Sequence, residues 1–359
     1  MKDFSDIIDL PPYSLKREEK EFLLNNNLIE LSKFHYDRCS KYAKIIDGIK
    51  LNLNDIDNYY EIPFLPVRLF KMFNLKSVND EEIIKTMTSS GTSGQTVSKI
   101  FLDRNTSSNQ TKVLSKIVSS FIGKKRAPMI IVDSEAIVKD RKLFSARGAG
   151  ILGFSMFGSK RIYALDENMN LKIDQIIDFI NENKNQRIFI FGFTFIIYQH
   201  FFKVLEKLNL KLDLSNSVMI HGGGWKKLIN ESVSSKIFRQ NLNSVCGIKH
   251  VHDYYGMVEQ TGSIYMECEE GFLHTPIYSD VIIRRPHDFS IANPGEKGII
   301  QVLSMLPKSY PGHSLLTEDE GALVGEDNCK CGRLGKYFKI YGRLPNAEIR
   351  GCSDTYEKK

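Results

Sequence analysis

A twelve-residue stretch rich in hydroxyl groups, TSSGTSGQTVSK at residues 88–99, contains two glycines and ends in a lysine. Glycine lets the backbone approach a ligand and direct several N–H groups at it, while hydroxyls add donors and lysine adds positive charge. These groups suit a phosphate chain. The spacing is not that of a Walker loop, whose second glycine would fall at Thr96 when counted from Gly91. A solvated Ser/Gly linker is the alternative, although strand and helix patterns flank the stretch closely.

Two further segments place glycines and a carboxylate where α/β proteins bind ligands. SVMIHGGG reads as a strand that leads into Gly223 and Gly224, which puts both glycines at its carboxyl end. DYYGMVEQTG places Tyr255 and Gly256 just ahead of Glu259. A carboxylate beside a phosphate loop is suited to holding magnesium against the phosphates. Taken alone, the second segment is equally consistent with a surface turn that carries a solvated Glu.

A third glycine segment, GAGILG at residues 148–153, formally matches the dinucleotide-binding fingerprint. No convincing strand precedes it, and FSMFGSKR soon interrupts any helix after it. We therefore expect a turn beside an apolar pocket rather than a nicotinamide site.

ECEEGFLH and NCKCG supply three thiols and one imidazole, which is a normal tetrahedral ligand set for zinc. The four residues are Cys268, His274, Cys329 and Cys331. The CxC spacing is tighter than the usual CxxC, and the alternative is a set of reduced cysteines packed in a β-rich subdomain. Cys39, expected on a helix, and Cys246, expected in a loop, are predicted to be inert.

The composition is that of an ordinary globular protein: 359 residues, 42% hydrophobic and 26% charged. The net charge of +6 is spread along the chain, which suits small anionic ligands better than nucleic acid. The N-terminus carries acidic residues and prolines instead of a signal peptide's apolar stretch. The longest apolar run, IFIFGFTFII, is about half of what a membrane span needs. We expect a cytoplasmic protein with no membrane span and with reduced cysteines.

Hydrophobic periodicity predicts the elements that must position these residues. Helices are expected at about 14–47, 107–122, 173–184, 195–208 and 225–238. Strands are expected at 97–103, 127–133, 187–193, 217–224, 279–286 and 297–306. Alternating strands and helices predict an α/β fold with a mainly parallel sheet, and the strands after 279 predict a β-rich subdomain.

Five segments taken in order resemble the successive motifs of the adenylate-forming superfamily, which includes acyl-CoA synthetases and joins a carboxylate to AMP from ATP. They are TSSGTSGQTVSK, HGGGWKK, YYGMVE, LLTEDEG and YGRLPNAEIRG. More closely, EIPFLPVRLFK, KTMTSSGTSGQTVSKIFLD and DRKLFSARGAGILGF resemble the LuxE acyl-protein synthetases, the fatty-acid-activating subunits of bacterial luminescence. The resemblance covers nearly the whole chain. It implies an adenylate-forming large domain over residues 1–342, β-rich at about 265–342, followed by a hinge and flexible tail over 343–359.

The resemblance implies ATP and Mg²⁺ as cofactors and assigns a phosphate loop. The matching loop residues are Ser89, Ser90, Gly91, Thr92, Ser93 and Gly94. Lys99 is a candidate phosphate contact, although the superfamily's Pro-Lys after the loop is absent here. Gly223 and Gly224 match the stretch that flanks the adenine.

The later motifs supply the remaining nucleotide contacts. Tyr255 with Gly256 match the turn that contacts the nucleotide, and Glu259 takes the magnesium role. Asp319 matches the residue that binds the ribose hydroxyls, in a Thr-Glu-Asp that replaces the superfamily's Thr-Gly-Asp. Arg343 matches the hinge residue at the ribose or phosphate.

Only residues 344–359 follow Arg343, so the resemblance implies that the mobile C-terminal domain is largely absent. Cys352, in the tail RGCSDTYEKK, is then the candidate acyl acceptor, because a thiolate is a suitable nucleophile and Arg350 favours the ionised form. The LuxE resemblance agrees, since that family carries the fatty acid on a cysteine near its C-terminus. The alternative is an exposed thiol on a frayed tail.

We expect activation of a fatty acid to acyl-AMP and its transfer to Cys352 as a thioester, for delivery to a partner acyl reductase. The resemblance also implies an acyl-transferase subunit of a fatty acid reductase complex. Phenylacetate-CoA ligase relatives resemble the Cys/His region, including CGR, and some carry a structural zinc there. Two alternatives stay open: an acyl-CoA synthetase that uses free coenzyme A, and a catalytically inactive nucleotide-binding scaffold.

Overall fold

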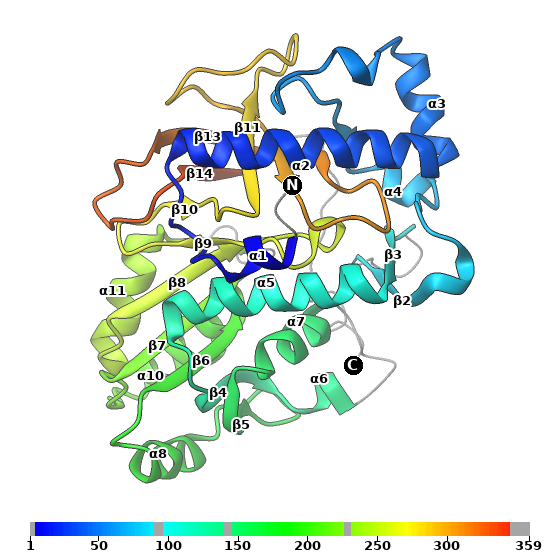
Figure 1. Cartoon of the computed structure of the whole chain (residues 1–359). Helices are drawn as coiled ribbons and strands as arrows, with labels where there is room; N and C mark the ends of the chain where they lie inside the picture. The colour runs from blue at the N-terminus through cyan, green and yellow to red at the C-terminus, as the bar shows by residue number, and fades with distance from the viewer. Residues whose placement is uncertain (1–3, 90–95, 140–145, 226–230, 345–359) are drawn as a thin grey trace. The chain divides into compact units, whose positions relative to one another are not determined.

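The computed structural model describes residues 4–89, 96–139, 146–225 and 231–344 (Figure 1). These residues form two compact units. The first unit contains described residues up to 89 together with 96–120 and 256–344, and the second contains those from 121 to 255. The described residues are a mixture of helices and strands, as the α/β prediction requires.

The second unit is built on a parallel sheet in the order β8-β7-β6-β4-β5. Its strands are β4 (Ala127–Ser134), β5 (Gly158–Leu165), β6 (Ile188–Phe193), β7 (Ser217–Gly222) and β8 (His250–Tyr255). Strands β4, β6 and β7 are apolar and buried along nearly their whole length, as in parallel sheets covered on both faces. The predicted parallel sheet is confirmed.

The helices of the second unit show where the sequence prediction was incomplete. They are α6 (Ala136–Lys139), α7 (Ala146–Ser155), α8 (Ile173–Glu182), α9 (Thr194–Ile196), α10 (Lys203–Lys207) and α11 (Ser235–Cys246). A π-helical turn, η3 (Ile197–Phe202), joins α9 to α10 within the helix expected over 195–208.

Three local predictions in this unit are wrong. GAGILG lies inside α7 rather than in a turn, and a Cβ at Gly150 would lie 3.1 Å from Phe193 Cζ, so glycine there allows close helix packing. Residues 226–230 of the helix expected over 225–238 lie outside the described ranges. In the described part, helix α11 begins only at Ser235, because the Ser234 hydroxyl accepts from Ile237 N at 3.3 Å and caps it. Cys246 accordingly ends a helix instead of lying in a loop.

The first unit contains a sheet in the order β11-β12-β13-β14-β10-β9, antiparallel throughout, with β1 added in parallel to β13. Its strands are β1 (Leu65–Pro66), β9 (Tyr265–Glu267), β10 (Leu273–His274), β11 (Ser279–Arg284), β12 (Gly298–Ser304), β13 (Ser314–Glu326) and β14 (Lys336–Arg343). The expected β-rich part is therefore present. A separate two-stranded sheet pairs β2 (Ile83–Thr88) with β3 (Lys99–Asp103).

The helical elements of the first unit come mainly from its N-terminal part. They are α1 (Phe4–Asp9), α2 (Arg17–Arg38), α3 (Ser40–Gly48), η1 (Leu53–Asp55), α4 (Leu69–Met72), η2 (Asp80–Glu82), α5 (Arg104–Ile122) and η5 (Val258–Gln260). The single helix expected over 14–47 is two, because the backbone of Cys39 is extended (φ −117°, ψ 95°) and separates α2 from α3.

A buried cluster of charges fastens α2 to the sheet of the first unit, alongside which it runs in Figure 1. Asp280 on β11 accepts from Lys20 Nζ of α2 at 3.3 Å and from Lys336 Nζ of β14 at 2.6 Å. The Tyr59 hydroxyl donates to the same carboxylate at 2.7 Å. All four side chains are buried, so the helix contributes a charge to the interior of the unit as well as an apolar face.

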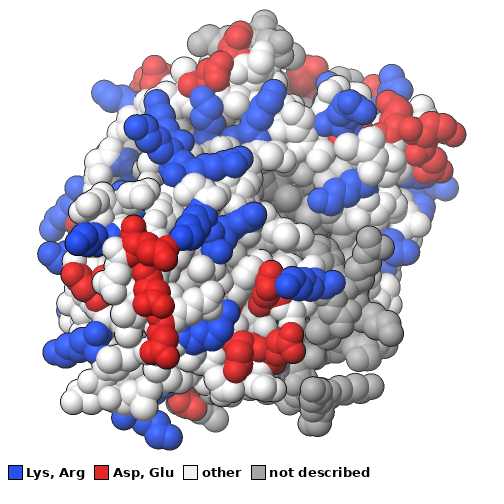
Figure 2. Space-filling view, turned by 90° about the horizontal axis from the view of Figure 1, so that it is seen from below, with Lys and Arg blue, Asp and Glu red and all other residues white. Residues whose placement is uncertain are grey.

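Basic and acidic side chains are interspersed over the face shown in Figure 2. Among the described residues, no helix combines the length and the apolar character that a bilayer crossing requires.

Candidate functional site

Strands β2 and β3 form a hairpin in the first unit, and most of the Ser/Thr/Gly stretch lies between them in the sequence. Ser89 N donates to Ser98 O at 3.2 Å, and Ser98 N donates to Ser89 Oγ at 2.9 Å, so the residues that flank the connection are bonded to each other. Lys99 is exposed and pairs with Thr88 as the first residue of β3. The other predicted loop residues lie outside the described ranges; they are Ser90, Gly91, Thr92, Ser93 and Gly94.

The turn that carries Glu259 packs against this hairpin. Thr261 Oγ1 lies 3.9 Å from Met87 Sδ of β2. Gly262 has φ +90°, and a Cβ there would come within 2.7 Å of Gln110 Cα on α5, so the close approach requires glycine. Glu259 itself is buried, with 2% of its surface exposed. The structure thus brings a predicted metal-binding carboxylate beside the hairpin that carries the predicted phosphate loop.

Asp319 and Arg343, both predicted nucleotide contacts, belong to one ionic cluster in the first unit. They face each other across β13 and β14, and Glu318 Oε2 lies 3.4 Å from Arg343 Nη1. Glu318 also pairs with Arg68, which precedes α4. Sequence reasoning missed Arg68 and Glu318. The signal was present in PVRLF and in the Thr-Glu-Asp triplet, but only the fold shows that the two segments meet.

In the second unit, the glycines after β7 and the residue that ends β8 lie at the carboxyl edge of the parallel sheet. Gly223 has φ +80°, which favours glycine, and a Cβ there would meet Phe193 Cδ1 at 3.3 Å. Gly224 has open space around its Cα, and Tyr255 is the last residue of β8. The placement agrees with the ligand-binding edge expected for such sheets. Gly256 falls in the first unit, where a Cβ would meet Ile264 Cγ2 at 2.9 Å.

His221 is a further polar group at this edge. Its Nδ1 lies 2.9 Å from Thr194 Oγ1 and 3.6 Å from Asp253 Oδ1. Burial, together with the positive charge of Arg239, lowers the pKa of His221 to about 3. The imidazole is therefore neutral at physiological pH and acts as a hydrogen-bonding group that fixes the start of α9 against the end of β7.

The four predicted zinc ligands converge in the first unit. One ligand atom from each of Cys268, His274, Cys329 and Cys331 lies within 4.8 Å of all the others. Cys331 Sγ is 3.4 Å from His274 Nε2, and Cys268 Sγ is 3.9 Å from Cys329 Sγ. The ring of Tyr337 stacks on His274 with centroids 5.5 Å apart.

This cluster fits a tetrahedral cation site. Burial raises the pKa of Cys268 to about 12 and lowers that of His274 to about 4, so without a cation the Cys268 thiol and the His274 imidazole are both neutral. Zinc would stabilise the thiolate forms that it binds, and a neutral imidazole is the form it accepts. A set of three sulfurs and one nitrogen is the usual composition of a structural zinc site.

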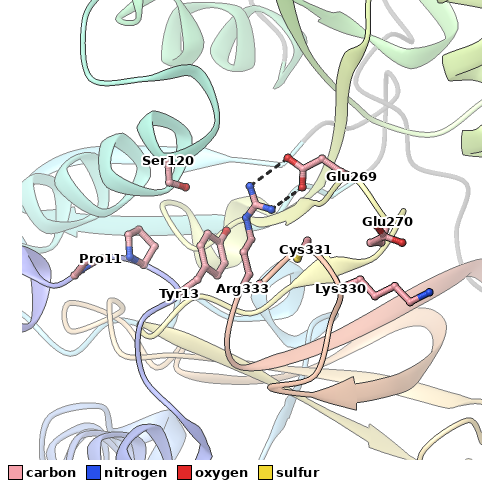
Figure 3. Close-up of a pocket in the computed structure, with 10 residues that line it drawn as sticks. Pro11, Tyr13, Ser120, Glu269, Glu270, Lys330, Cys331 and Arg333 are labelled. Atoms are coloured by element: carbon pink, nitrogen blue, oxygen red, sulfur yellow. Dashed lines mark hydrogen bonds and ion pairs between the residues drawn. The ribbon is translucent and has the colours of Figure 1, made fainter.

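A cavity of about 590 Å³ opens beside Cys331 (Figure 3). Arg333 reaches across it to Glu269, with Nη1 2.7 Å from Oε2, and its guanidinium carbon lies 5.9 Å from the centre of the Tyr13 ring. The residues just before α2 and the loop between β13 and β14 therefore share one wall. Cys352, the predicted acyl acceptor, lies outside the described residues.

Comparison with known proteins identifies a family. The family described as "Acyl-protein synthetase, LuxE" matches residues 2–359. The long-chain-fatty-acid–luciferin-component ligase of Aliivibrio fischeri is 25% identical over 364 residues, covering 97% of this chain and 93% of that one. The corresponding ligase of Photorhabdus luminescens is 31% identical over 96 residues, covering 25% of this chain and 80% of that sequence.

Solved structures show the same fold. A 2-hydroxyisobutyryl-CoA ligase in complex with 2-HIB-AMP and CoA superposes with a TM-score of 0.70 at 13% identity, covering 93% of this chain and 72% of that one. The same ligase with R3-HIB-AMP gives a TM-score of 0.71, covering 94% and 71%. The fold is thus that of adenylate-forming ligases, and by the match along its whole length this chain belongs to the LuxE family of acyl-protein synthetases.

Proposed function

We propose that this chain uses Mg-ATP to convert a fatty acid into an acyl-adenylate and then carries the acyl group on Cys352. In the first step a carboxylate oxygen attacks the α-phosphorus of ATP, the bond to pyrophosphate breaks, and a mixed anhydride forms. In the second step the thiolate of Cys352 attacks the acyl carbon, the bond to AMP breaks, and a thioester remains. Such steps depend on positioning and on charge neutralisation.

The observation that carries the proposal is the packing of the Glu259 turn against the β2–β3 hairpin. Thr261 touches Met87, and Gly262 allows the turn to lie directly on α5, which follows the hairpin. A buried carboxylate beside a loop of hydroxyls and glycines can hold a cation against a polyphosphate. Magnesium, when bound, would neutralise the charge that builds up on the departing pyrophosphate.

For the remaining predicted residues we propose the roles that the family resemblance implies. The loop residues Ser89, Ser90, Gly91, Thr92, Ser93 and Gly94 donate hydrogen bonds to the phosphates, and Lys99 adds positive charge. Gly223, Gly224, Tyr255 and Gly256 border the nucleotide. Asp319 accepts hydrogen bonds from the ribose hydroxyls, and Arg343 contacts the ribose or a phosphate. The segment 343–359 serves as a hinge and tail that delivers Cys352 to the adenylate.

A two-part assay tests both steps. Exchange of labelled pyrophosphate into ATP, in the presence of palmitate or a shorter acid, reports adenylation and should be lost in Glu259→Gln. Incubation with ATP and radiolabelled acid should label the protein through a bond that neutral hydroxylamine cleaves. Cys352→Ser should abolish that label and leave exchange intact, whereas the buried Cys246→Ser serves as the control that keeps it. Absence of exchange with every acid tested would overturn the proposal.

The thioester also implies a recipient. A labelled acyl group on the tail suits transfer to a partner acyl reductase, with an acyl-transferase subunit supplying the acid. Loss of label on adding a reductase and NADPH, with the matching aldehyde formed, would support this partner. If Cys352→Ser still yields thioester when coenzyme A is supplied, the acceptor is the diffusible thiol instead.

The cluster of Cys268, His274, Cys329 and Cys331 is proposed as a structural zinc site. Elemental analysis of the purified protein should find about one zinc per chain. Cys329→Ser should lower the zinc content, whereas Cys39→Ser, a buried thiol outside the cluster, should not. An unchanged zinc content in Cys329→Ser would exclude the cluster as the site.

A further inference from the structure

Gln260, the residue after Glu259, is a buried side chain that the sequence prediction did not single out. Only 1% of its surface is exposed. Its Nε2 donates to Val302 O of β12 at 3.1 Å and to Gly312 O at 2.8 Å. One amide group thus ties the Glu259 turn to a strand of the sheet and to the turn that leads into β13.

The turn at Gly312 also packs directly against the backbone of Glu259. A Cβ at Gly312 would lie 2.8 Å from Glu259 O and 2.3 Å from the ring of Tyr310, so no larger residue fits there. Burial, and next the negative charge of Glu259, raise the pKa of Tyr310. The phenol therefore lies within the electrostatic reach of the Glu259 carboxylate.

The same segment, residues 305–313, is fastened on its other side to the hairpin region. Ser309 Oγ donates to Phe101 O of β3 at 2.7 Å, and Ser309 N donates to Thr106 Oγ1 of α5 at 3.2 Å. Strand β3 ends the hairpin that carries the Ser/Thr/Gly connection. Segment 305–313 is therefore a rigid link between that hairpin and Glu259, and the amide of Gln260 closes the link on the Glu259 side.

We propose that Gln260 is a positioning residue, which through its two hydrogen bonds fixes the Glu259 carboxylate relative to the β2–β3 hairpin for metal–polyphosphate binding. The inference rests on the magnesium role proposed for Glu259. Without the amide, two buried carbonyls lose their donor, and the turn relaxes. A displacement of about 1 Å at a binding group is enough to cost up to about a hundredfold in rate.

The test compares Gln260→Met, which keeps the length of the side chain and removes its donors, with a matched control. Gln301→Met on β12 also removes a buried glutamine, one that bonds Ser314 Oγ at 3.0 Å and Arg284 Nε at 2.7 Å. Pyrophosphate exchange is measured against Mg²⁺ concentration at fixed ATP, and urea unfolding measures stability. Gln260→Met should raise the Mg²⁺ concentration for half-maximal exchange about tenfold. Gln301→Met should lower stability comparably and leave that concentration unchanged.

The variant Glu259→Gln distinguishes the positioning role of Gln260 from the magnesium role of Glu259. If Glu259→Gln abolishes exchange or raises its Mg²⁺ requirement, and Gln260→Met behaves like Gln301→Met, the positioning role is overturned and the role of Glu259 stands. If Glu259→Gln leaves the Mg²⁺ requirement unchanged, the magnesium role fails and the positioning role falls with it. Should Gln260→Met not fold, Gln260→Asn decides, since its shortened amide should give an intermediate rise, and a wild-type Mg²⁺ requirement would overturn the proposal.

Discussion

Asp319 on β13 and Arg343 on β14 stand directly opposite each other in the antiparallel ladder, with Arg343 Nε 3.8 Å from Asp319 Oδ1. The same guanidinium lies 3.4 Å from Glu318, which also pairs with Arg68. The two carboxylates of the Thr-Glu-Asp triplet thus both lie beside one arginine.

Asp319→Asn should raise the KM for ATP in pyrophosphate exchange by about ten- to a hundredfold. The physical reason is the loss of charged hydrogen bonds to hydroxyls, each worth about 1.5–3 kcal/mol. Glu320→Gln is the control, since Glu320 follows on the same strand and pairs only loosely with Lys297 at 3.8 Å. An unchanged KM in Asp319→Asn would show that the ribose is held elsewhere.

Asp280→Asn should lower the free energy of unfolding by about 3–5 kcal/mol, because it leaves two buried ammonium groups without their carboxylate. Burial opposes ionisation of Asp280, but the charges of Lys336 and Lys20 outweigh it and lower the pKa of the carboxyl to about 2. Urea unfolding at neutral pH measures the loss. A loss of less than about 1 kcal/mol would mean that water already stabilises the two ammonium groups.

The same carboxyl group predicts the direction in which the free energy of unfolding changes at acid pH. Its pKa in the folded state, about 2, lies below the unfolded value of about 3.9, so its contribution is complete above pH 4 and is lost as the pH falls toward 2. The difference in unfolding free energy between wild type and Asp280→Asn should therefore decrease by about 2–3 kcal/mol as the pH falls over this range. If the difference in unfolding free energy between the two proteins does not change with pH, the stabilisation comes from packing.

Two stacked histidines predict a second pH dependence, at milder acidity. The rings of His35 and His313 lie 4.9 Å apart, and His35 Nδ1 is 2.8 Å from Ser77 Oγ. Burial lowers the pKa of His35 to about 3 and that of His313 well below its usual value. Because the unfolded state binds these protons first, stability is complete above about pH 6.5 and decreases as the pH falls.

Between pH 6.5 and 5 the slope should approach about 1.4 kcal/mol per pH unit for each histidine. His35→Gln should reduce the slope by about one such increment, while the exposed His287→Gln should leave it as in wild type. Equal slopes in all three proteins would show that the stacked pair does not control the response.

Metal removal should loosen the residues just before α2. Leu334 N donates to Tyr13 O at 3.3 Å, and the Tyr13 ring meets His274 edge-on with centroids 6.1 Å apart. Chelation would release the loop between β13 and β14, which contributes Leu334, and the ring of His274 on β10. Tryptic cleavage at Arg17 should then be faster, both with EDTA and in Cys329→Ser. A cleavage rate that is unaffected while zinc leaves the protein would contradict this coupling.

Local patterns predicted the elements whose signal lies within one segment. The apolar run at 127–133 was enough to identify β4, and the ligand types of Cys268, His274, Cys329 and Cys331 were enough to suggest their common site. Periodicity alone placed a helix over 225–238 too early. The capping hydroxyl of Ser234 sets the start of α11, and apolar spacing does not reveal it.

Contacts between distant parts of the chain account for what the sequence did not reveal. In the sequence Gln260 is an ordinary polar residue, and only the structure shows that it donates to the carbonyls of Val302 and Gly312. The role of Arg68 becomes apparent only from its ion pair with Glu318, which the fold brings to the segment before α4. In each case the chemistry depends on which backbone oxygen or carboxylate the fold supplies, and a single sequence does not specify that partner.

Because the ammonium of Lys20 sits inside the first unit beside Asp280, the opening third of α2 cannot be trimmed as a dispensable extension. Any shortened version meant for crystallisation or for fusion to another protein should begin ahead of this lysine. A version that starts later would remove the Lys20 ammonium from the buried cluster around Asp280, and it would be expected to be less stable.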